Sequence, residues 1–421
     1  MKIINDLYKS KKAQKQFFPT KLKKGIRLHE PTYNVDEINA VVKTLISTRL
    51  TFGPITKKFE LNFTKYFKTK DSLYVNSGSS ANLLALSILT NPYFKNRMMP
   101  GDEVIVPALS WSTSVWPIIQ ANLKPVFVDI DHKTMNVDSS KIESAITAKT
   151  KCILIIHTYG NACDMREILR IKKKYKLYLI EDTCESLGTK YGENYCGTLG
   201  DIGTYSFYFS HHITTVEGGM LITKNKEIAK IGRMLRAHGW IRDLDEKDKK
   251  FYERKYKHID KKFLFTNIGY NLRGSEVGAS MGIVQLKKLK KILVKRSKTA
   301  NFWKKYFKNN KIFKLQEETP NSKHSWFGIP IMLNKKYFSQ IGLIRKILDK
   351  NNIETRPIIC GNITKQPAMK RLKFRIFNNL NYTDEVMNGS FAIGCHQNIS
   401  IKNLEYAKKI FSDIEKKICK K

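Results

Sequence analysis

Short apolar runs of strand length alternate with helical patterns between about residues 70 and 225 of the chain. Seven runs predict strands at residues 72–75, 103–107, 125–129, 152–157, 177–181, 204–208 and 220–223. The segments between them follow the spacing of helices that bury one face. This alternation is typical of a largely parallel sheet covered by helices on both faces, so the pattern predicts an α/β fold.

The C-terminal part of the chain changes pattern. A lysine-rich amphipathic helix is expected from Ser280 to about Lys308, and mixed strands and helices follow to the end. We expect a basic extension at residues 1–24, a large domain at 25–285 and a smaller C-terminal α/β domain at 286–421. Ligands of parallel sheets bind beyond the carboxyl ends of the strands, where the sequence places Asn76, Trp111, Asp182 and His211.

Length and charge narrow the possible partners. The 421 residues are 42% hydrophobic, enough for two packed cores, and 76 Lys and Arg against 37 Asp and Glu give a net charge of +39. Such a charge suits nucleic acids or membranes. However, the excess lysine is spread along helices and no nucleic-acid motif is visible, so we expect a solvated surface that attracts anionic ligands, with no nucleic-acid or membrane partner. No signal peptide or apolar run of about 18 residues is present, which predicts a cytoplasmic protein.

The seven cysteines are scattered along the chain. They form no C-x-x-C pair and no spacing typical of zinc or iron–sulfur ligation. We expect reduced thiols and no metal site.

The segment from Tyr74 to Ala85 runs from a strand through small residues directly into an apolar helix. The N–H groups and the positive dipole end of that helix, together with the serine hydroxyls, suit a phosphate group. An ordinary serine-capped turn gives the same pattern, so this segment alone does not establish a phosphate site.

Two further strand ends carry groups suited to a heteroaromatic ring. Trp111 follows a predicted strand and offers either a flat surface for a ring or filling for the core. Asp182 ends another strand and can hold a proton on a pyridine nitrogen or cap the next helix. Glu185, one turn later, is in reach of a ring hydroxyl.

Taken together, these segments resemble the DegT/DnrJ/EryC1/StrS family of sugar aminotransferases, which use pyridoxal phosphate (PLP), from about residue 25 to residue 416. Further family-like pieces are Thr51-Phe52-Gly53-Pro54, His157-Thr158-Tyr159-Gly160, Leu235-Arg236-Ala237-His238-Gly239 and Gly269-Tyr270-Asn271-Leu272-Arg273-Gly274. The resemblance implies an aspartate-aminotransferase-like (fold type I) domain with a mostly parallel central sheet. It also implies a homodimer with shared active sites.

The resemblance also assigns roles to residues of this chain. It implies that Asp182 contacts the pyridine nitrogen, Glu185 the 3-hydroxyl and Trp111 the ring face. It implies a phosphate site formed by the remaining cofactor residues, Gly78, Ser79, Ser80, Ser206 and, from the partner subunit, Asn271. For the sugar and its diphosphate, His238, Arg356 and His396 are candidates, with a structural or solvated role as the alternative for each.

His211 departs from the family pattern. The aminotransferases have a lysine five residues after the serine that here is Ser206, and that lysine amine condenses with the cofactor aldehyde. An imidazole forms no stable imine but can transfer protons. The segments around His211 and Asp182 resemble the 3-dehydratase branch of the family, which removes the C3 hydroxyl of nucleotide-linked 4-keto-6-deoxy sugars. We therefore expect His211 to be the catalytic base.

Three alternatives remain open at this point. A GDP-linked substrate is favoured over a CDP-linked one, because the CDP branch holds an iron–sulfur cluster and residues 212–269 contain no cysteine. In the GDP branch an amino acid such as L-glutamate is implied as the donor that regenerates pyridoxamine phosphate (PMP). A non-catalytic binding protein with a degenerate site is the third possibility.

Overall fold

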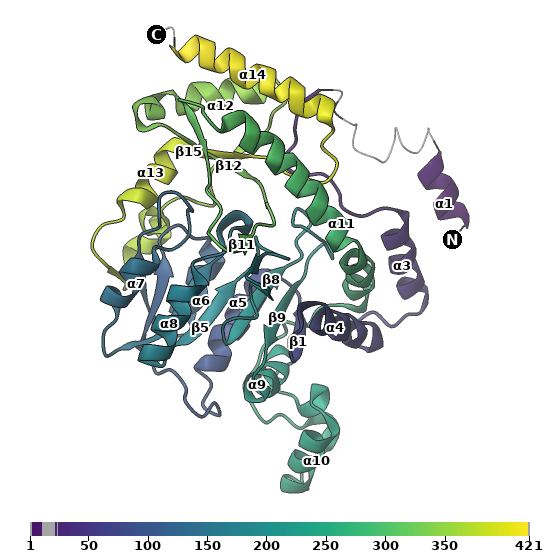
Figure 1. Cartoon of the computed structure of the whole chain (residues 1–421). Helices are drawn as coiled ribbons and strands as arrows, with labels where there is room; N and C mark the ends of the chain where they lie inside the picture. Colours follow the sequence, from purple (N-terminus) through teal and green to yellow (C-terminus); the bar gives the residue numbers. More distant parts are fainter. Residues whose placement is uncertain (1, 11–21, 23, 420–421) are drawn as a thin grey trace.

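The computed structural model describes residues 2–10, 22 and 24–419, and its main body is an eight-stranded sheet (Figure 1). The strand order is β1-β9-β8-β5-β4-β2-β3-β14. The strands are β1 (Asp71–Val75), β2 (Glu103–Pro107), β3 (Lys124–Val128), β4 (Thr150–Ile156), β5 (Tyr178–Asp182), β8 (Ile202–Ser206), β9 (Gly219–Thr223) and β14 (Arg375–Ile376). Neighbouring strands from β8 to β14 are parallel, whereas β9 is antiparallel to β1 and β8. All seven predicted strands and the mostly parallel sheet are confirmed.

Side chains of the sheet alternate between two apolar layers. Val104 and Val106 pack in the layer of α5, α6 and α9, whereas Ile105 between them packs in the layer of α7 and α8. Because successive side chains of a strand point to opposite faces, continuous apolar strands require helices on both sides. The helices of this part are α3 (Val35–Ile46), α4 (Pro54–Phe67), α5 (Gly78–Leu89), α6 (Ser112–Gln120), α7 (Ser139–Ala145), α8 (Met165–Tyr175), α9 (Lys226–Arg236) and α10 (Glu246–Lys255), and α1 (Lys2–Lys9) lies beside α3.

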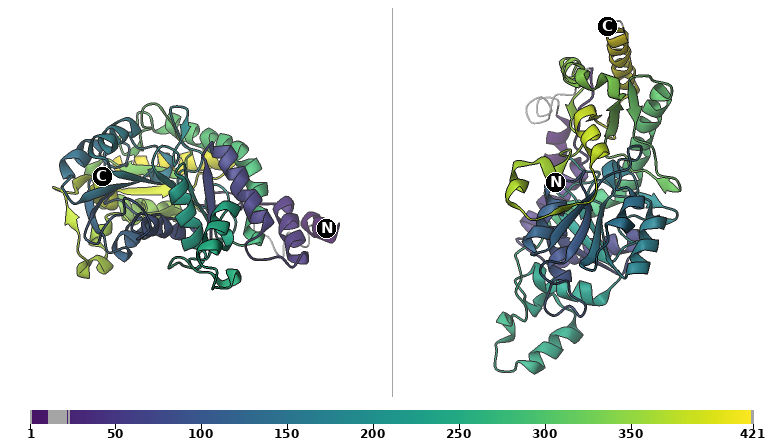
Figure 2. Two further views of the ribbon diagram at one scale, coloured as in Figure 1. Left: turned by 90° about the horizontal axis from the view of Figure 1, so that it is seen from below. Right: turned by 90° about the vertical axis from the view of Figure 1, so that its left-hand side faces the viewer.

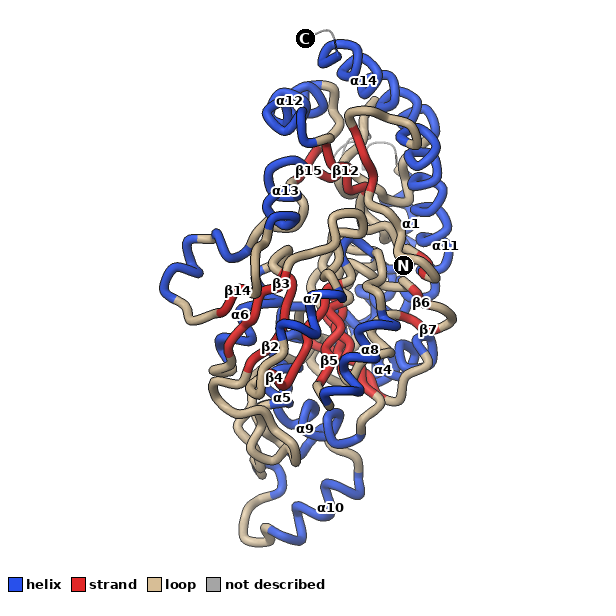
Figure 3. The backbone as a smooth tube through the Cα atoms, turned by 60° about the vertical axis from the view of Figure 1, so that its left-hand side comes forward, coloured by secondary structure: helices blue, strands red, loops and turns tan. Residues whose placement is uncertain are grey.

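The C-terminal part forms a smaller antiparallel sheet with the strand order β10-β12-β15-β13. The long helix α11 connects it to the main body, and the sheet stands above the large one, at the end opposite the projecting α10 (Figures 2 and 3). The elements are α11 (Glu276–Phe307), β10 (Phe313–Leu315), β12 (Ile329–Leu333), α12 (Ile341–Lys350), β13 (Thr355–Arg356), α13 (Asn381–Gly389), β15 (Ser390–Ile393) and α14 (Ile401–Cys419). A core around Trp303, Phe307 and Phe411 joins these helices to the small sheet.

Short elements complete the chain. A three-stranded sheet contains β6 (Lys190–Tyr191), β7 (Asn194–Tyr195) and β11 (Ser322–Lys323), and the 3-10 turns are η1 (Thr158–Gly160), η2 (Ile241–Asp243), η3 (Lys261–Phe263), η4 (Lys335–Gln340), η5 (Ile363–Lys365) and η6 (Pro367–Arg371). Within the described ranges, no helix is long and apolar enough to cross a bilayer. All seven cysteines are free thiols in the structure.

The domain limits 25–285 and 286–421 stay a prediction. The helix α11 runs without interruption through residue 285, and β14 returns from the C-terminal part to the edge of the large sheet. Ile26 in turn pairs with Ile353 and packs in the core of the small sheet. Of the predicted extension at 1–24, residues 1, 11–21 and 23 lie outside the described residues.

Candidate active site

A cavity of about 380 Å³ lies beyond the carboxyl ends of β5 and β8, on the side that faces the small sheet. Eight of the residues predicted from sequence to form the site line it: Gly78, Ser79, Trp111, Asp182, Glu185, Ser206, His211 and Arg356. Parallel strands that end at one edge bring these distant segments together. Asn76 at the end of β1 is exposed and does not line the cavity.

The N-terminus of α5 forms one wall of the cavity. Ser77 caps the helix through its side-chain oxygen, which accepts from the Ser80 N–H at 3.0 Å. The first N–H groups of a helix have no intrahelical acceptor, so those of Gly78 and Ser79 can bind an anion. A Cβ atom on Gly78 would stand 2.5 Å from the Ser206 Cβ, so the turn requires glycine to pack this closely. The wall therefore fits a phosphate group.

Asp182 is held by three hydrogen bonds at the end of β5. Its Oδ2 accepts from Asn82 Nδ2 at 2.8 Å and from Ser114 Oγ at 2.7 Å, and its Oδ1 accepts from the Cys184 N–H at 3.1 Å. The Asn82 amide is itself fixed, because its Oδ1 accepts from Thr204 Oγ1 at 2.6 Å. A carboxylate fixed by neutral donors keeps its charge available for a cationic ring nitrogen.

Trp111 precedes α6 and is 51% exposed, so a large part of the indole is free to contact a ligand ring. Such exposure is unusual for tryptophan and argues against the alternative that Trp111 fills the core.

Glu185 accepts from the Tyr159 N–H at 3.0 Å. Burial raises the pKa of Glu185 to about 7, although the charge of Arg356 and the bond from Tyr159 act in the opposite direction. Tyr159 has a left-handed backbone with φ 56°. Backbone strain of this kind at a non-glycine residue often accompanies functional sites. A carboxyl group that titrates near neutral pH can either donate or accept a hydrogen bond in the cavity.

His211 lines the same cavity as Ser206. Its backbone N–H donates to Tyr208 O at 2.9 Å, and the centroid of its ring lies 5.0 Å from that of the Phe327 ring. Its buried Nδ1 atom has no hydrogen-bond partner among the described residues. Burial, and after it the charges of Arg356, Arg296 and His29, lower the pKa of His211 to about 3. No lysine is among the described residues that line the cavity.

Four predicted residues lie away from the cavity lining. Ser80 donates to the cap and pairs with the Ser77 hydroxyl at 2.9 Å. His238 and Asn271 are exposed and both contact Arg273, at 3.3 Å and 3.2 Å. His396 is buried after β15, where its Nδ1 accepts from the Asn398 N–H at 3.3 Å. The roles predicted for these four residues stay predictions.

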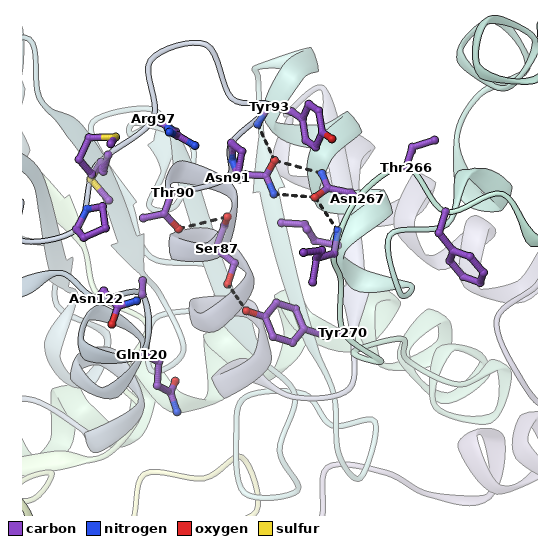
Figure 4. A pocket seen from close by; sticks show the side chains of 18 of the residues that line it. Ser87, Thr90, Asn91, Tyr93, Arg97, Gln120, Asn122, Thr266, Asn267 and Tyr270 are labelled. Carbon is purple, nitrogen blue, oxygen red and sulfur yellow. Dashed lines mark hydrogen bonds between the residues drawn. The ribbon is translucent and has the colours of Figure 1, made fainter. Parts of the chain in front are cut away.

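Two other features of the structure do not suit catalysis. His157, Glu181 and Cys196 lie together in the core, but the Glu181 oxygens already accept from three backbone N–H groups and face His157 Nε2 at 3.0 Å. A cavity of about 840 Å³ lies at the far end of α5, where Asn91 and Asn267 exchange amide hydrogen bonds (Figure 4). Arg97 is the one charged side chain among the described residues of its lining.

Comparison with known proteins shows the family to which the chain belongs. The model of the DegT/DnrJ/EryC1/StrS aminotransferase family matches residues 31–411. The chain belongs to this family. A GDP-4-keto-6-deoxy-D-mannose 3-dehydratase of Yersinia pseudotuberculosis is 37% identical over 92% of this chain and 98% of its own length.

Solved structures of the DegT/DnrJ/EryC1/StrS family confirm the fold. The E. coli GDP-4-keto-6-deoxy-D-mannose-3-dehydratase with bound hydrated PLP has a TM-score of 0.86 and 34% identity, covering 92% of this chain and 99% of that chain. A GDP-4-keto-6-deoxymannose-3-dehydratase with a trapped PLP-glutamate geminal diamine has a TM-score of 0.85 at the same identity and covers 92% of this chain and 100% of that chain. The aspartate-aminotransferase-like architecture expected from the family resemblance is thus confirmed.

Three side chains near the cavity had no role predicted from the sequence. Asn82 and Ser114 hold Asp182, and Phe327 contacts His211. Asn82 had a visible signal, because it is a lone amide in an otherwise apolar part of α5 and a buried amide needs partners. Phe327 had none, because an aromatic residue before a strand is more often part of a core.

Proposed function

We propose that this chain is a PLP/PMP-dependent 3-dehydratase that removes the C3 hydroxyl of a nucleotide-linked 4-keto-6-deoxyhexose. The GDP-linked 4-keto-6-deoxy-D-mannose is the substrate that we favour, and L-glutamate the donor that regenerates PMP. The observation that carries the proposal is that His211, rather than a lysine, stands in the cavity with Asp182, Trp111 and the α5 N-terminus. The relatives named for this reaction on the GDP sugar support it.

The cavity walls fit the cofactor in three places. The Asp182 carboxylate suits a protonated pyridine nitrogen, the Trp111 face suits the ring, and the N–H groups of Gly78 and Ser79 with Ser206 suit the phosphate. The bound cofactor supplies an electron sink and, as PMP, an amine that joins a keto sugar. Glu185 would hold the 3-hydroxyl, donating or accepting according to pH.

His211 would act as the base and then as the acid of the dehydration. Its lowered pKa leaves the imidazole neutral near pH 7, with a ring nitrogen free to accept a proton from carbon. The imidazolium that results is a strong acid in this buried place, so it gives the proton readily to the hydroxide that leaves C3. A lysine here would hold the cofactor aldehyde and favour amine transfer instead.

The sugar and its diphosphate would contact Arg356 at the cavity and, across a homodimer interface, His238 of the partner subunit, while Asn271 of the partner subunit would reach the cofactor phosphate. Both residues are exposed on one surface cluster of this chain, which leaves them free to contact a second copy. His396 is buried and does not line the cavity, so its predicted contact with the sugar or its diphosphate stays a prediction.

Two other functions have less support from the described residues. A CDP-sugar enzyme with an iron–sulfur cluster needs grouped cysteines, and the described chain shows no such group. A non-catalytic binding protein would not need a neutral, unpartnered imidazole in the cavity.

The test is incubation of the PLP-loaded protein with L-glutamate and GDP-, CDP- or dTDP-4-keto-6-deoxy sugars, followed by mass analysis. We expect loss of one oxygen from the GDP sugar without added reductase. Loss from the CDP sugar alone would reassign the substrate, and no loss from any sugar while PLP remains bound would support the binding protein.

A further inference from the structure

Ile359 is a strained isoleucine in the lining of the active-site cavity. It follows β13, is 6% exposed, and has a left-handed backbone with φ 50°. A β-branched residue rarely adopts this conformation, because its side chain crowds the backbone, whereas glycine adopts it freely. A hydrogen bond from the Ile363 N–H to Ala108 O at 3.0 Å holds the segment that follows. The chain therefore has an isoleucine where the backbone alone would favour glycine.

The residues packed around Ile359 share this strain. Tyr159, with φ 56°, belongs to the same buried apolar cluster as Ile359. Phe327 packs against that cluster and directly follows Trp326, which has φ 54°. The Phe327 N–H donates to Tyr159 O at 2.8 Å, and the centroids of the two rings lie 5.7 Å apart. Backbone strain gathered in one place is typical of residues that bind a ligand.

The strained residues also supply the apolar part of the cavity. Among the described residues that line it, three have side chains of carbon and hydrogen alone, namely Ile156, Phe327 and Ile359. Ile156 is opposite Asp182 in the register of β4 and β5, so it belongs to the end that suits the pyridine nitrogen. Phe327 and Ile359 remain, and the centroid of the Phe327 ring lies 5.0 Å from that of His211. These two side chains form an apolar wall beside the proposed base.

A 6-deoxy sugar has one apolar substituent that fits such a wall. Its hydroxyl groups, ring oxygen and diphosphate need polar partners, whereas the methyl group on C5 gains free energy from contact with hydrocarbon. This methyl group is two bonds from C4, the carbon that joins the cofactor amine, so it lies close to the base that acts there. A hydroxyl on C6 would instead meet Phe327 and Ile359, whose side chains offer it no hydrogen bond.

We propose that Phe327 and Ile359 form a subsite for the C5 methyl group and select 6-deoxy sugars over sugars that carry a C6 hydroxyl. The inference rests on the proposed function, because that reaction brings C4 of the sugar beside His211. The arrangement gives a reason for the strain at Ile359. Glycine would relax the backbone, but it would leave a gap in the wall next to the methyl group.

The test measures how strongly the PLP-loaded protein prefers a 6-deoxy sugar. The probes are GDP-6-deoxy-D-mannose and GDP-D-mannose, which differ only in the oxygen on C6. The pair of dTDP-6-deoxy-D-glucose and dTDP-D-glucose makes the same comparison on another nucleotide. None of the four has a keto group at C4, so calorimetry reports binding alone. The measured quantity is the ratio of the two dissociation constants in the pair that binds more tightly.

Ile359→Thr is the main variant, and Ile359→Val is its matched control. Both keep the branch at Cβ and hence the backbone strain, but threonine brings a hydroxyl into the wall. We expect wild type and Ile359→Val to prefer the 6-deoxy sugar by about 10- to 100-fold, the range in which an apolar site rejects an added hydroxyl. Ile359→Thr should lower this preference about fivefold or more relative to Ile359→Val. A merely structural role for Ile359 would weaken both sugars of a pair equally and leave the ratio unchanged.

Each outcome decides the subsite. If Ile359→Thr does not fold, Ile359→Ala replaces it, because loss of the wall should bring the two dissociation constants within about threefold of each other. Equal binding of the two sugars by wild type, equal ratios in the valine and threonine variants, or no binding of either pair would overturn the subsite. The proposed function would still stand if the mass assay shows loss of oxygen from a 4-keto-6-deoxy sugar. If wild type deoxygenates no sugar while its preference depends on Ile359, the proposed function is refuted and the subsite stands.

Discussion

Replacing Asp182 with asparagine removes one charge from the cavity and changes almost no volume. The carboxylate is 4% exposed and accepts three hydrogen bonds. If the new amide nitrogen takes the Oδ2 position, it faces Asn82 Nδ2; if it takes the Oδ1 position, it faces the Cys184 N–H. In either orientation one donor points at another. Asn82 cannot turn to relieve this, because its own oxygen accepts from Thr204.

Two separate costs follow. One buried donor without an acceptor costs about 1–3 kcal/mol of unfolding free energy, with or without cofactor. Loss of the charge-assisted bond to the ring nitrogen costs about 1.5–3 kcal/mol of binding free energy, which corresponds to a PLP dissociation constant about 10- to 150-fold higher. The second cost appears only when PLP is present.

Urea unfolding of the cofactor-free protein measures the first cost, and a PLP titration followed by absorbance measures the second. Ser114→Ala is the control, since it removes one neutral donor to Asp182 and keeps the charge. It should change PLP affinity by less than about fivefold. A PLP dissociation constant within about twofold of wild type in Asp182→Asn would refute the assignment of this carboxylate to the ring nitrogen.

Three further predictions concern the other walls of the cavity. His211→Asn should lower deoxygenation at least about 100-fold with PLP affinity nearly unchanged, and full activity by mass analysis would disprove its role as the base. His211→Lys should form a covalent link to PLP that borohydride fixes; no mass increase after reduction would mean that this side chain does not face the aldehyde. Because the pKa of Glu185 is raised from 4.5 to about 7 by burial, its contribution to stability is present below pH 4.5 and is lost as pH rises through 7. Glu185→Gln should therefore flatten the difference in unfolding free energy of the cofactor-free protein between about pH 5 and 8, and an unchanged slope would count against a buried, titrating carboxyl group.

The seven main strands were predictable because each is an apolar run bounded by polar turns. Their parallel order also predicted that Trp111, Asp182 and His211 would meet at one edge. The antiparallel direction of β9 had no clear signal, because residues 207–218 between β8 and β9 are about as many as the dozen that a parallel crossover needs. The two-residue strand β14 had no local signal. It is fixed by long-range contacts, including the Arg375 fork on Glu103 with bonds of 3.1 and 2.8 Å.

The burial of Arg296 is a second feature that could not be predicted from the sequence. This arginine lies in a helix with many lysines, where one more positively charged side chain is expected to lie on the solvated surface. Arg296 is buried where α11 packs against the segment 326–327, whose two carbonyl groups accept from its Nη1. Burial is a property of the tertiary arrangement, so a charge pattern alone could not separate this arginine from its neighbours.

The choice of cations around His211 has a chemical consequence. The chain holds 76 lysine and arginine residues, yet the charges that act on His211 most directly are those of two arginines, Arg356 and Arg296, and no described lysine lines the cavity. A guanidinium stays protonated and cannot attack an aldehyde, whereas a buried lysine readily loses its proton and becomes a nucleophile. Arginines therefore give this site positive charge for phosphate and carboxylate groups without offering an amine that would hold the cofactor. In a site built this way, the amine can enter only with the donor, and His211 is left free to transfer protons.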